Sequence, residues 1–318
     1  MSLISIVVPV YNNASSLADL LQQFQDISSQ YHEDSFEFIF VDDGSFDNSI
    51  TVLHELLQRE PRIRIVMLSR NFGSNAAIMA GMSQVRGEAI IAIAADLQDP
   101  PELMGEMLRL WREDHKVVLA ARKSRDDGFL SDALSNAFYA LFRRFAIKTM
   151  PRHGFDFFLI DRQVCDVINH IQENNAYLMG LILWLGFEPE VIYYDRKKRE
   201  KKYGRSMCTQ AKMIKYFIDS FVSFSYVPIR AASIIGISLS IVGLLYAIAV
   251  IILRLILQIK VEGWASLMIA VLILSGSQML MLGIMGEYMW RNLEETRRRP
   301  RYIISKTTQT PPSDEAAV

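Results

Sequence analysis

Acidic and amide side chains cluster in residues 93–102, which read IAADLQDPPE. This stretch follows an apolar run and ends in two prolines, so it lies where a buried strand would reach the surface. The polar side chains just before the prolines are those of Asp96, Gln98 and Asp99. Carboxylate and amide oxygens suit Mg²⁺ or Mn²⁺, and such a cation can in turn bind phosphate. The stretch therefore predicts a divalent-cation site that could hold a diphosphate.

Polar residues also follow two other predicted strands. Tyr11 and Asn12 come after the first apolar run, and Asp42 and Asp43 come after the second. Ligands in doubly wound sheets bind beyond the carboxyl ends of the strands, so the three clusters would converge on one crevice. Turn or capping chemistry is the alternative explanation for each cluster. No Gly-x-Gly-x-x-Gly follows the first strand and no Gly-Lys-Ser/Thr loop occurs, so neither a dinucleotide fingerprint nor a P-loop is expected.

The elements that would position these residues alternate between strands and helices. Short runs rich in β-branched residues predict buried parallel strands at 3–10, 36–41, 63–68, 88–95 and 116–121. Helical faces between them are Leu17, Leu20, Leu21 and Phe24 after a cap at Ser15 or Ser16, and Ile50, Leu53, Leu56 and Leu57 after Asp47. This alternation predicts an α/β, Rossmann-like domain with a mostly parallel sheet.

Composition and residue spacing argue against several other kinds of site and partner. The formal net charge of −1 over 318 residues indicates no particular charged partner. Cys165 and Cys208 lie far apart and match no metal-ligand spacing, so we expect reduced thiols without a chemical role. The five histidines also show no ligand spacing. The basic segment 195–205 lacks interleaved stacking residues, so no nucleic-acid partner is expected. The chain begins directly with an apolar strand, and we expect no cleaved signal peptide.

Two long uncharged runs lie near the C-terminus. Twenty-three uncharged residues separate Arg230 from Arg254, and 24 separate Glu262 from Glu287. About 20 helical residues cross a bilayer core, so each run is long enough to span it. The alternative is a pair of buried core helices. Because 51% of the chain is hydrophobic and the excess is concentrated here, we predict two transmembrane helices.

Basic residues flank this hairpin on both sides, whereas the loop between its helices is short. DRKKREKKYGR precedes the first run, and RNLEETRRRPR follows the second. The positive-inside rule then predicts a multi-pass protein of the cell (inner) membrane with its α/β domain and both termini in the cytoplasm. The expected parts are the α/β domain (1–200), a basic and aromatic interfacial segment (201–228), the transmembrane hairpin (229–290) and a cytoplasmic tail (291–318) whose residues 307–318 look disordered.

The chain resembles the family 2 glycosyltransferases with a GT-A fold. The motifs that carry the resemblance are IVVPVYNN, FVDDGSFDNS, LSRNFGSNAAIMAG, ADLQDPPE and GFDFFLIDR, spread over roughly residues 3–300. The two apolar runs narrow the resemblance to the polyisoprenyl-phosphate glycosyltransferases, which include bactoprenol glucosyltransferases and dolichyl-phosphate mannose synthases. The resemblance implies transfer of a sugar, with inversion, from a nucleotide sugar to a polyprenyl phosphate.

The resemblance also implies roles for individual residues. Asp96 and Gln98 would coordinate Mg²⁺ or Mn²⁺, and Asp156 in GFDFF would join Asp96 as a catalytic residue near the acceptor. Arg122 would approach the diphosphate. The full set expected to bind the nucleotide sugar is Pro9, Tyr11, Asn12, Val41, Asp42, Asp43, Arg70, Ala95 and Arg122.

Three positions depart from the family pattern. Ala94 stands where the first acidic residue of Asp-x-Asp is usual, so metal ligation would depend on Asp96, Gln98 and diphosphate oxygens. Phe158 replaces a common arginine after Asp-Phe, and Met207 replaces a lysine after Gly-x-Ser. Both of these changes remove positive charge expected near the phosphates.

The acceptor chemistry shapes the roles expected of the remaining residues. A phosphate monoester has a second pKa of about 6, so it is already mostly ionised at cytoplasmic pH. Asp156 would therefore chiefly orient sugar hydroxyls and stabilise the oxocarbenium-like centre. Arg199, Lys202 and Arg205 could bind the lipid phosphate. The alternative is that these basic residues only set topology or bind anionic lipid.

We therefore predict a metal-dependent hexosyltransferase that moves glucose from UDP-glucose to undecaprenyl phosphate, in a homo-oligomer such as a tetramer. Another donor, of the GDP-mannose or UDP-4-amino-arabinose type, is an alternative. A processive synthase would usually carry Gln-x-x-Arg-Trp, which is absent from the sequence. A catalytically weak membrane scaffold is the alternative from another class, and Ala94 is the residue that raises it.

Overall fold

The computed structural model describes most of the chain, which falls into two compact units. One unit is Met1–Phe221 with Pro300–Val318, and the other is Val222–Arg299. The residues described are 1–123, 139–171, 173, 177–196, 224–225, 227–255 and 263–309. We treat each unit separately and refer to the first as the sheet domain.

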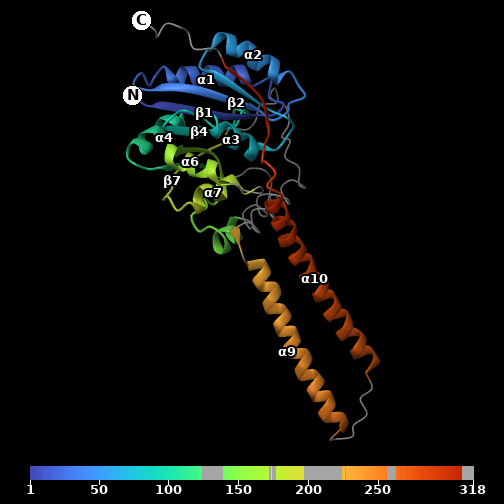
Figure 1. Ribbon diagram of the computed structural model, residues 1–318. Helices are drawn as coiled ribbons and strands as arrows, with labels where there is room; N and C mark the ends of the chain where they lie inside the picture. The colour runs from blue at the N-terminus through green and yellow to red at the C-terminus, as the bar shows by residue number, and fades with distance from the viewer. Residues whose placement is uncertain are drawn as a thin grey trace. The chain divides into compact units, whose positions relative to one another are not determined.

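The described part of the sheet domain is built on one eight-stranded sheet with the strand order β7-β5-β6-β4-β1-β2-β3-β8 (Figure 1). The strands are β1 Leu3–Val10, β2 Ser35–Asp42, β3 Ile63–Leu68, β4 Ala89–Ala92, β5 Val117–Arg122, β6 Phe155–Asp161, β7 Glu190–Tyr194 and β8 Ile304–Gln309. Strands β3, β2, β1 and β4 are parallel neighbours. The α/β class and the mostly parallel sheet are therefore confirmed.

The sequence did not indicate where the sheet stops being parallel. The predicted strand 88–95 is shorter than expected, since β4 ends at Ala92. Strand β5 is not its neighbour, because β6 lies between them and runs antiparallel to both. Strand β6 comes from the GFDFFLIDR motif, whose apolar run we had not assigned to a strand. This insertion brings the start of β6 to the edge where β4 and β5 end.

Helices cover both faces of the sheet. The helices on one face are α1 Leu17–Ser28, α2 Ser49–Arg59 and α4 Leu103–Arg112; those on the other are α3 Ser74–Met82, α6 Arg162–His170 and α7 Leu178–Trp184. On the first face, the predicted apolar residues of α1 pack with Ile4, Ile6 and Val8 of β1 in one buried cluster. On the second, Gly81 of α3 lies so close to Val7 that a Cβ would be 2.3 Å from its side chain. The domain is thus a three-layer α/β/α sandwich.

Hydrogen bonds near the starts of α1 and α2 connect the segments that follow neighbouring strands. Ser16 occupies the N-cap position of α1, but its Oγ lies 2.6 Å from the Ala95 carbonyl oxygen and 3.0 Å from that of Asn13 and can donate to either. Helix α2 has Asn48, not the expected Asp47, at its N-cap. The Asp47 carboxylate instead accepts the Ser49 and Ala14 N–H groups, at 3.0 and 3.1 Å. These bonds join the segments that follow β1, β2 and β4.

The second unit contains two long helices that contact each other, α9 Val227–Leu255 and α10 Trp264–Arg297. Both are long and apolar enough to cross a membrane, and none of the residues in their most apolar stretches is buried within the structure. The alternative of buried core helices is therefore not supported. Helix α10 extends beyond the predicted end of the hairpin at residue 290.

The chain returns to the sheet domain after α10. Residues 307–309, which we expected to be disordered, belong to β8, which pairs antiparallel with β3. The Ser69 N–H donates to the Ile303 carbonyl oxygen at 2.9 Å, and Arg301 donates to the carbonyl oxygen of Ile171. A local hydrophobicity pattern cannot reveal this strand, because most of its residues are exposed at the edge of the sheet. Both ends of the hairpin are consequently attached to the same domain.

We predict that β8 contributes to the stability of the sheet domain. A truncated variant that ends at Arg299 keeps both long helices but loses β8, so β3 loses its outer hydrogen-bonding partner. Its Tm, followed by near-UV circular dichroism in detergent, should fall by at least about 3 °C. The matched control ends at Gln309 and retains the strand, so its Tm should equal that of the full chain. Equal Tm values for both truncations would contradict the prediction.

Candidate active site

The segments that follow β1 and β2 are bound to each other. Asn12 adopts a left-handed conformation with φ of 55°, and its N–H donates to Ser45 Oγ at 3.0 Å. In return, the Phe46 N–H donates to Asn12 Oδ1 at 2.9 Å. The Phe46 ring stays 87% exposed and lies edge-on to the Tyr11 ring, with 6.3 Å between centroids. Hydrogen bonds from backbone N–H groups to side-chain oxygens therefore hold an aromatic pair, a half-buried Tyr11 and an exposed Phe46, at the carboxyl edge of the sheet.

Asp43 connects this edge to the loop after β3. Its N–H donates to the Val10 carbonyl oxygen at 2.8 Å, and its carboxylate accepts the N–H groups of Phe72 and Gly73 at 2.7 and 2.9 Å. Burial raises the pKa of Asp43, and the two N–H groups oppose that shift by stabilising the carboxylate. The visible contacts of Asp43 thus hold the loop in place. Its expected contact with a nucleotide stays a prediction.

Gly44 allows the same loop to approach closely. Its φ is +71°, and a Cβ there would lie 2.9 Å from the backbone of both Arg70 and Asn71, so no other residue fits without strain. The Arg70 guanidinium packs over the Phe72 ring at 4.1 Å. Arg70 also acts electrostatically on Asp43, and its expected contact with the nucleotide sugar stays a prediction.

A second group of charges lies beyond β4 and β7. The Arg196 guanidinium lies 2.9 Å from Asp99 Oδ1 through Nε and 3.6 Å from Asp96 Oδ2 through a terminal nitrogen. The Tyr194 hydroxyl donates to Asp99, whose side chain is fully buried. Asp96 is more accessible, with its side chain 17% exposed. One guanidinium therefore links a buried carboxylate to the carboxylate predicted to bind metal.

Asp156 joins this edge from β6. The register between β5 and β6 shifts between Ala120 and Ala121, which leaves Asp156 without an opposite residue. Such bulges often redirect side chains beside active sites. The Asp156 carboxylate is 45% exposed and accepts a hydrogen bond from Arg122 at 2.8 Å. The two residues expected to act on the donor and the sugar are thus in direct contact.

These groups influence each other electrostatically. Burial raises the pKa of Asp99, while Arg196 and the Tyr194 hydroxyl act in the opposite direction. Burial also raises the pKa of Tyr194, and the adjacent Asp99 carboxylate adds to the shift. For Arg196, burial lowers the pKa, but Asp99, Asp156 and Asp96 together outweigh it and raise the value. We call Asp96, Asp99, Asp156, Arg122 and Arg196 the charge cluster.

The oxygen ligands that Asp96 and Gln98 offer fit a cation only if a substrate completes the coordination of that cation. Within the described ranges, no group of three or more His, Cys, Asp or Glu residues could hold a metal ion. Asp99 is engaged by Tyr194 and Arg196, and Ala94 supplies no oxygen ligand from its side chain. Mg²⁺ is usually bound by one or two carboxylates together with substrate phosphates and water. Asp96 with Gln98 matches that arrangement and does not form a closed protein-only site.

Other predicted donor-site residues are mostly buried. Pro9 and Val41 are paired in register on β1 and β2, and the Val41 side chain faces Gly81 of α3. Ala95 is 3% exposed. These residues can offer a ligand little beyond their backbone. The lipid-phosphate candidates Arg199, Lys202 and Arg205 lie outside the described residues, as does Met207. Phe158, in place of the family's arginine, is buried with its ring edge-on to Phe155.

Tyr194 and Arg196 at this edge are not predicted from the sequence, and Asp99 is noted there only as part of the acidic stretch, without a role of its own. A weak signal for Tyr194 and Arg196 was present. Burial along β7 alternates, with Ile192 and Tyr194 inside and Tyr193 outside, which is the period of an edge strand. Recognising that pattern would have placed Arg196 at a strand end. The Asp99 contact could not be foreseen, because its partner is 97 residues away.

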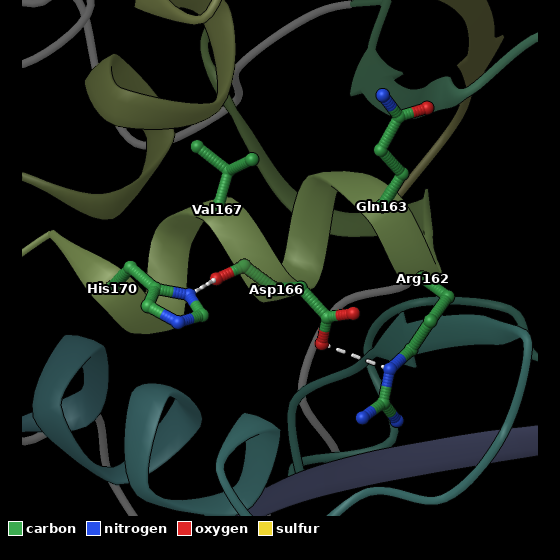
Figure 2. Close-up of a pocket in the computed structure, with 5 residues that line it drawn as sticks. All are labelled: Arg162, Gln163, Asp166, Val167 and His170. Carbon is green, nitrogen blue, oxygen red and sulfur yellow. Dashed lines mark hydrogen bonds and ion pairs between the residues drawn. The ribbon is translucent and has the colours of Figure 1, made fainter.

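A shallow hollow of about 580 Å³ lies elsewhere, on the outer surface of α6 (Figure 2). It is lined by Arg162, Gln163, Asp166, Val167 and His170. Arg162 and Asp166 form an ion pair at 2.9 Å, and the His170 ring is hydrogen-bonded to the Asp166 carbonyl oxygen. The Arg162 N–H donates to Glu88 at the amino end of β4, so α6 begins at the opposite edge of the sheet from the charge cluster. The hollow shares no residue with the candidate site.

Comparison with known proteins shows relatives along nearly the whole chain. Residues 5–171 match the family described as Glycosyl transferase family 2. The uncharacterized glycosyltransferase YkcC of Bacillus subtilis is 39% identical over 304 residues, which cover 95% of this chain and 93% of that protein. The SfII prophage-derived bactoprenol glucosyl transferase of Shigella flexneri is 31% identical over 96% of this chain and 98% of its own length. A prophage bactoprenol glucosyl transferase homolog of Escherichia coli is 31% identical over 95% and 98%.

The Asp43 contacts generate a prediction about the loop after β3. Asp43→Ala removes the acceptor for the Phe72 and Gly73 N–H groups, so hydrogen exchange at these two amides should accelerate by about tenfold or more. Asp42→Ala is the matched control, because Asp42 accepts only the nearby Ser45 N–H among the bonds described. It should affect the Ser45 amide and spare the loop. Unchanged exchange at residues 72 and 73 in Asp43→Ala would show that the carboxylate does not hold the loop.

Proposed function

Because this chain belongs to glycosyl transferase family 2, we propose that it transfers a hexose from a nucleotide sugar to the phosphate of a polyprenyl carrier. UDP-glucose is the proposed donor and undecaprenyl phosphate the proposed acceptor. Relatives named bactoprenol glucosyl transferases align over 95–96% of the chain, including the two apolar helices, and support this choice. The observation that carries the proposal is the charge cluster, in which Arg122 contacts Asp156 beside Asp96.

The donor would lie across the carboxyl edge of the sheet. The Tyr11 and Phe46 rings offer an apolar surface suited to a base, and Asp42 and Asp43 follow the adjacent strand. Arg122 lies where it can approach the diphosphate. Asp96 and Gln98 would hold Mg²⁺ or Mn²⁺, and the bound cation would offset negative charge on the leaving diphosphate.

The reaction would be a direct displacement. An oxygen of the lipid phosphate forms a bond to the anomeric carbon, while the bond from that carbon to the donor diphosphate breaks and the nucleoside diphosphate leaves with the electron pair. The phosphate nucleophile is already ionised near neutral pH, so it needs little help from a base. Asp156 is exposed and held by Arg122, which suits a group that orients sugar hydroxyls and stabilises positive charge at the anomeric carbon.

The membrane hairpin would hold the protein at the bilayer that contains its lipid acceptor. Both ends of the hairpin connect to the sheet domain, so both flanks lie on the same side of any bilayer that it crosses. The basic flanking segments favour the cytoplasmic side. We accordingly propose a multi-pass inner-membrane protein whose sheet domain and termini are cytoplasmic. A homo-oligomer stays a prediction from the sequence.

A non-catalytic membrane scaffold is the second candidate. Ala94 in place of an acidic residue, with no group of three acidic, His or Cys ligands in the described part of the chain, favours it. Under this alternative, the fold would be retained without metal-dependent transfer.

The test is a donor screen with the full-length protein in detergent. Undecaprenyl phosphate is incubated with UDP-glucose, GDP-mannose and a UDP-4-amino-arabinose donor, each with Mn²⁺, with Mg²⁺ or with EDTA. We expect UDP-glucose to increase the lipid mass by one hexose and EDTA to abolish the product. Transfer from a different donor would overturn the choice of glucose. No product with any donor would favour the scaffold.

A substitution of Asp156 tests the proposed catalytic role of this residue most directly. Asp156→Asn keeps the size of the side chain but removes the charge that faces the anomeric carbon, so kcat should fall by about 100-fold with little change in the donor KM. Asp166→Asn is the matched control, since Asp166 is 47% exposed and ion-paired to Arg162 at 2.9 Å on the surface of α6. Its kcat should match that of the parent. A nearly normal kcat for Asp156→Asn would remove this residue from the site.

A further inference from the structure

Asp99 is a buried carboxylate to which the proposed reaction assigns no role. It lies in the segment after β4, three residues from Asp96, and its side chain is fully buried. Burying an unpaired carboxylate costs several kcal/mol, so Asp99 needs a cationic or hydrogen-bonding partner. Its partners are Tyr194 at the end of β7 and Arg196 just beyond it.

The geometry of these contacts is asymmetric. The Nε side of the Arg196 guanidinium is anchored 2.9 Å from Asp99 Oδ1. One of its terminal nitrogens lies 3.4 Å from Asp99 Oδ2 and 3.6 Å from Asp96 Oδ2. The edge of the guanidinium formed by Nε and this terminal nitrogen therefore faces Asp99, and the same terminal nitrogen also lies beside Asp96.

The surrounding strands bring this edge next to the other site residues. Tyr194 is the register partner of Arg122 on the neighbouring strand β5. Arg122 in turn contacts Asp156 at 2.8 Å. The charge cluster therefore holds three carboxylates against two guanidiniums, and without Arg196 only one guanidinium would remain. A diphosphate placed beside Asp96 would then meet an excess of negative charge. A guanidinium fork matches phosphate oxygens well.

We propose that Asp99 is a positioning residue, which together with the Tyr194 hydroxyl holds Arg196 so that its guanidinium meets the donor diphosphate beside Asp96. This inference rests on the proposed function, since it assumes that a nucleotide sugar occupies the carboxyl edge. It also explains why a charged residue is buried in the segment after β4, where an apolar side chain would cost less to bury.

The test is a double-variant cycle in the full-length protein. Arg196→Gln should lower kcat/KM for the donor by about 100-fold, and Asp99→Asn by about tenfold. If Asp99 acts through Arg196, the double variant should be no more than about twofold worse than Arg196→Gln alone. UDP affinity, measured by calorimetry in EDTA, should fall in both single variants and no further in the double variant. The positioning role would be overturned if the losses in kcat/KM of the two single variants multiplied in the double variant. It would also be overturned if Asp99→Asn left kcat/KM unchanged.

Two further variants separate positioning from general stability. Glu37→Gln is the matched control, because Glu37 is a buried carboxylate ion-paired to Arg64 at 3.4 Å near the amino end of the sheet. It should lower the Tm and leave the donor kcat/KM unchanged. If Asp99→Asn does not fold, Tyr194→Phe removes only the hydroxyl and should lower kcat/KM by about threefold. An unchanged kcat/KM in Tyr194→Phe would then count against the proposal. An inactive parent protein would instead contradict the proposed function.

Discussion

The carboxyl edge of the sheet depends on a balance of charge. Asp96, Asp99 and Asp156 share this edge, and two like charges 4 Å apart repel by about 4 kcal/mol at an effective dielectric constant of 20. Arg122 and Arg196 offset that repulsion. They reach the edge because β5 and β7 are parallel neighbours that end side by side. No group of three His, Cys, Asp or Glu residues in the described part of the chain could hold a metal ion, so a cation at Asp96 would need oxygen ligands from the substrate. The same balance of charge therefore bears on both the donor site and the proposed metal.

The parallel half of the sheet was predictable because its signals are local. The predicted strands 3–10 and 63–68 have the bounds of β1 and β3, since each is a largely apolar run, interrupted only by Ser5 or Arg64, with polar residues on either side. The polar residues after β1, β2 and β4 could be placed at one edge for the same reason. Strand ends in a parallel sheet meet by topology, whatever their separation in sequence.

The other half of the site depends on pairings that no local pattern contains. The position of Asp156 follows from β6 running antiparallel between β4 and β5, and from a register shift beside it. Arg196 was grouped with the basic segment before the membrane, although Asp99 draws it into the sheet domain. Asp43 was predicted for nucleotide contact, whereas its described hydrogen bonds hold the loop after β3. Long-range partners thus determine which contacts these charged side chains make.

Strand β8 makes the sheet domain discontinuous in sequence, because it belongs to that domain but follows the second unit along the chain. The hairpin is an insertion within the sheet domain in sequence, because the chain leaves that domain before α9 and re-enters it after α10. The returning segment bonds to Ser69, the first residue of the loop that Asp43 holds. The segment that follows α10 is therefore hydrogen-bonded to the loop beside the proposed donor site.

The proposed donor site requires Asp96 to bind a divalent cation that is shared with the donor diphosphate. Electron–nuclear double resonance on Mn²⁺ added to the full-length protein with UDP tests it most directly. We predict a ³¹P coupling from the diphosphate and a protein-bound Mn²⁺ signal, both of which disappear in Asp96→Ala. Mn²⁺ that binds equally well to Asp96→Ala, or that shows no ³¹P coupling in the parent protein, would contradict the account.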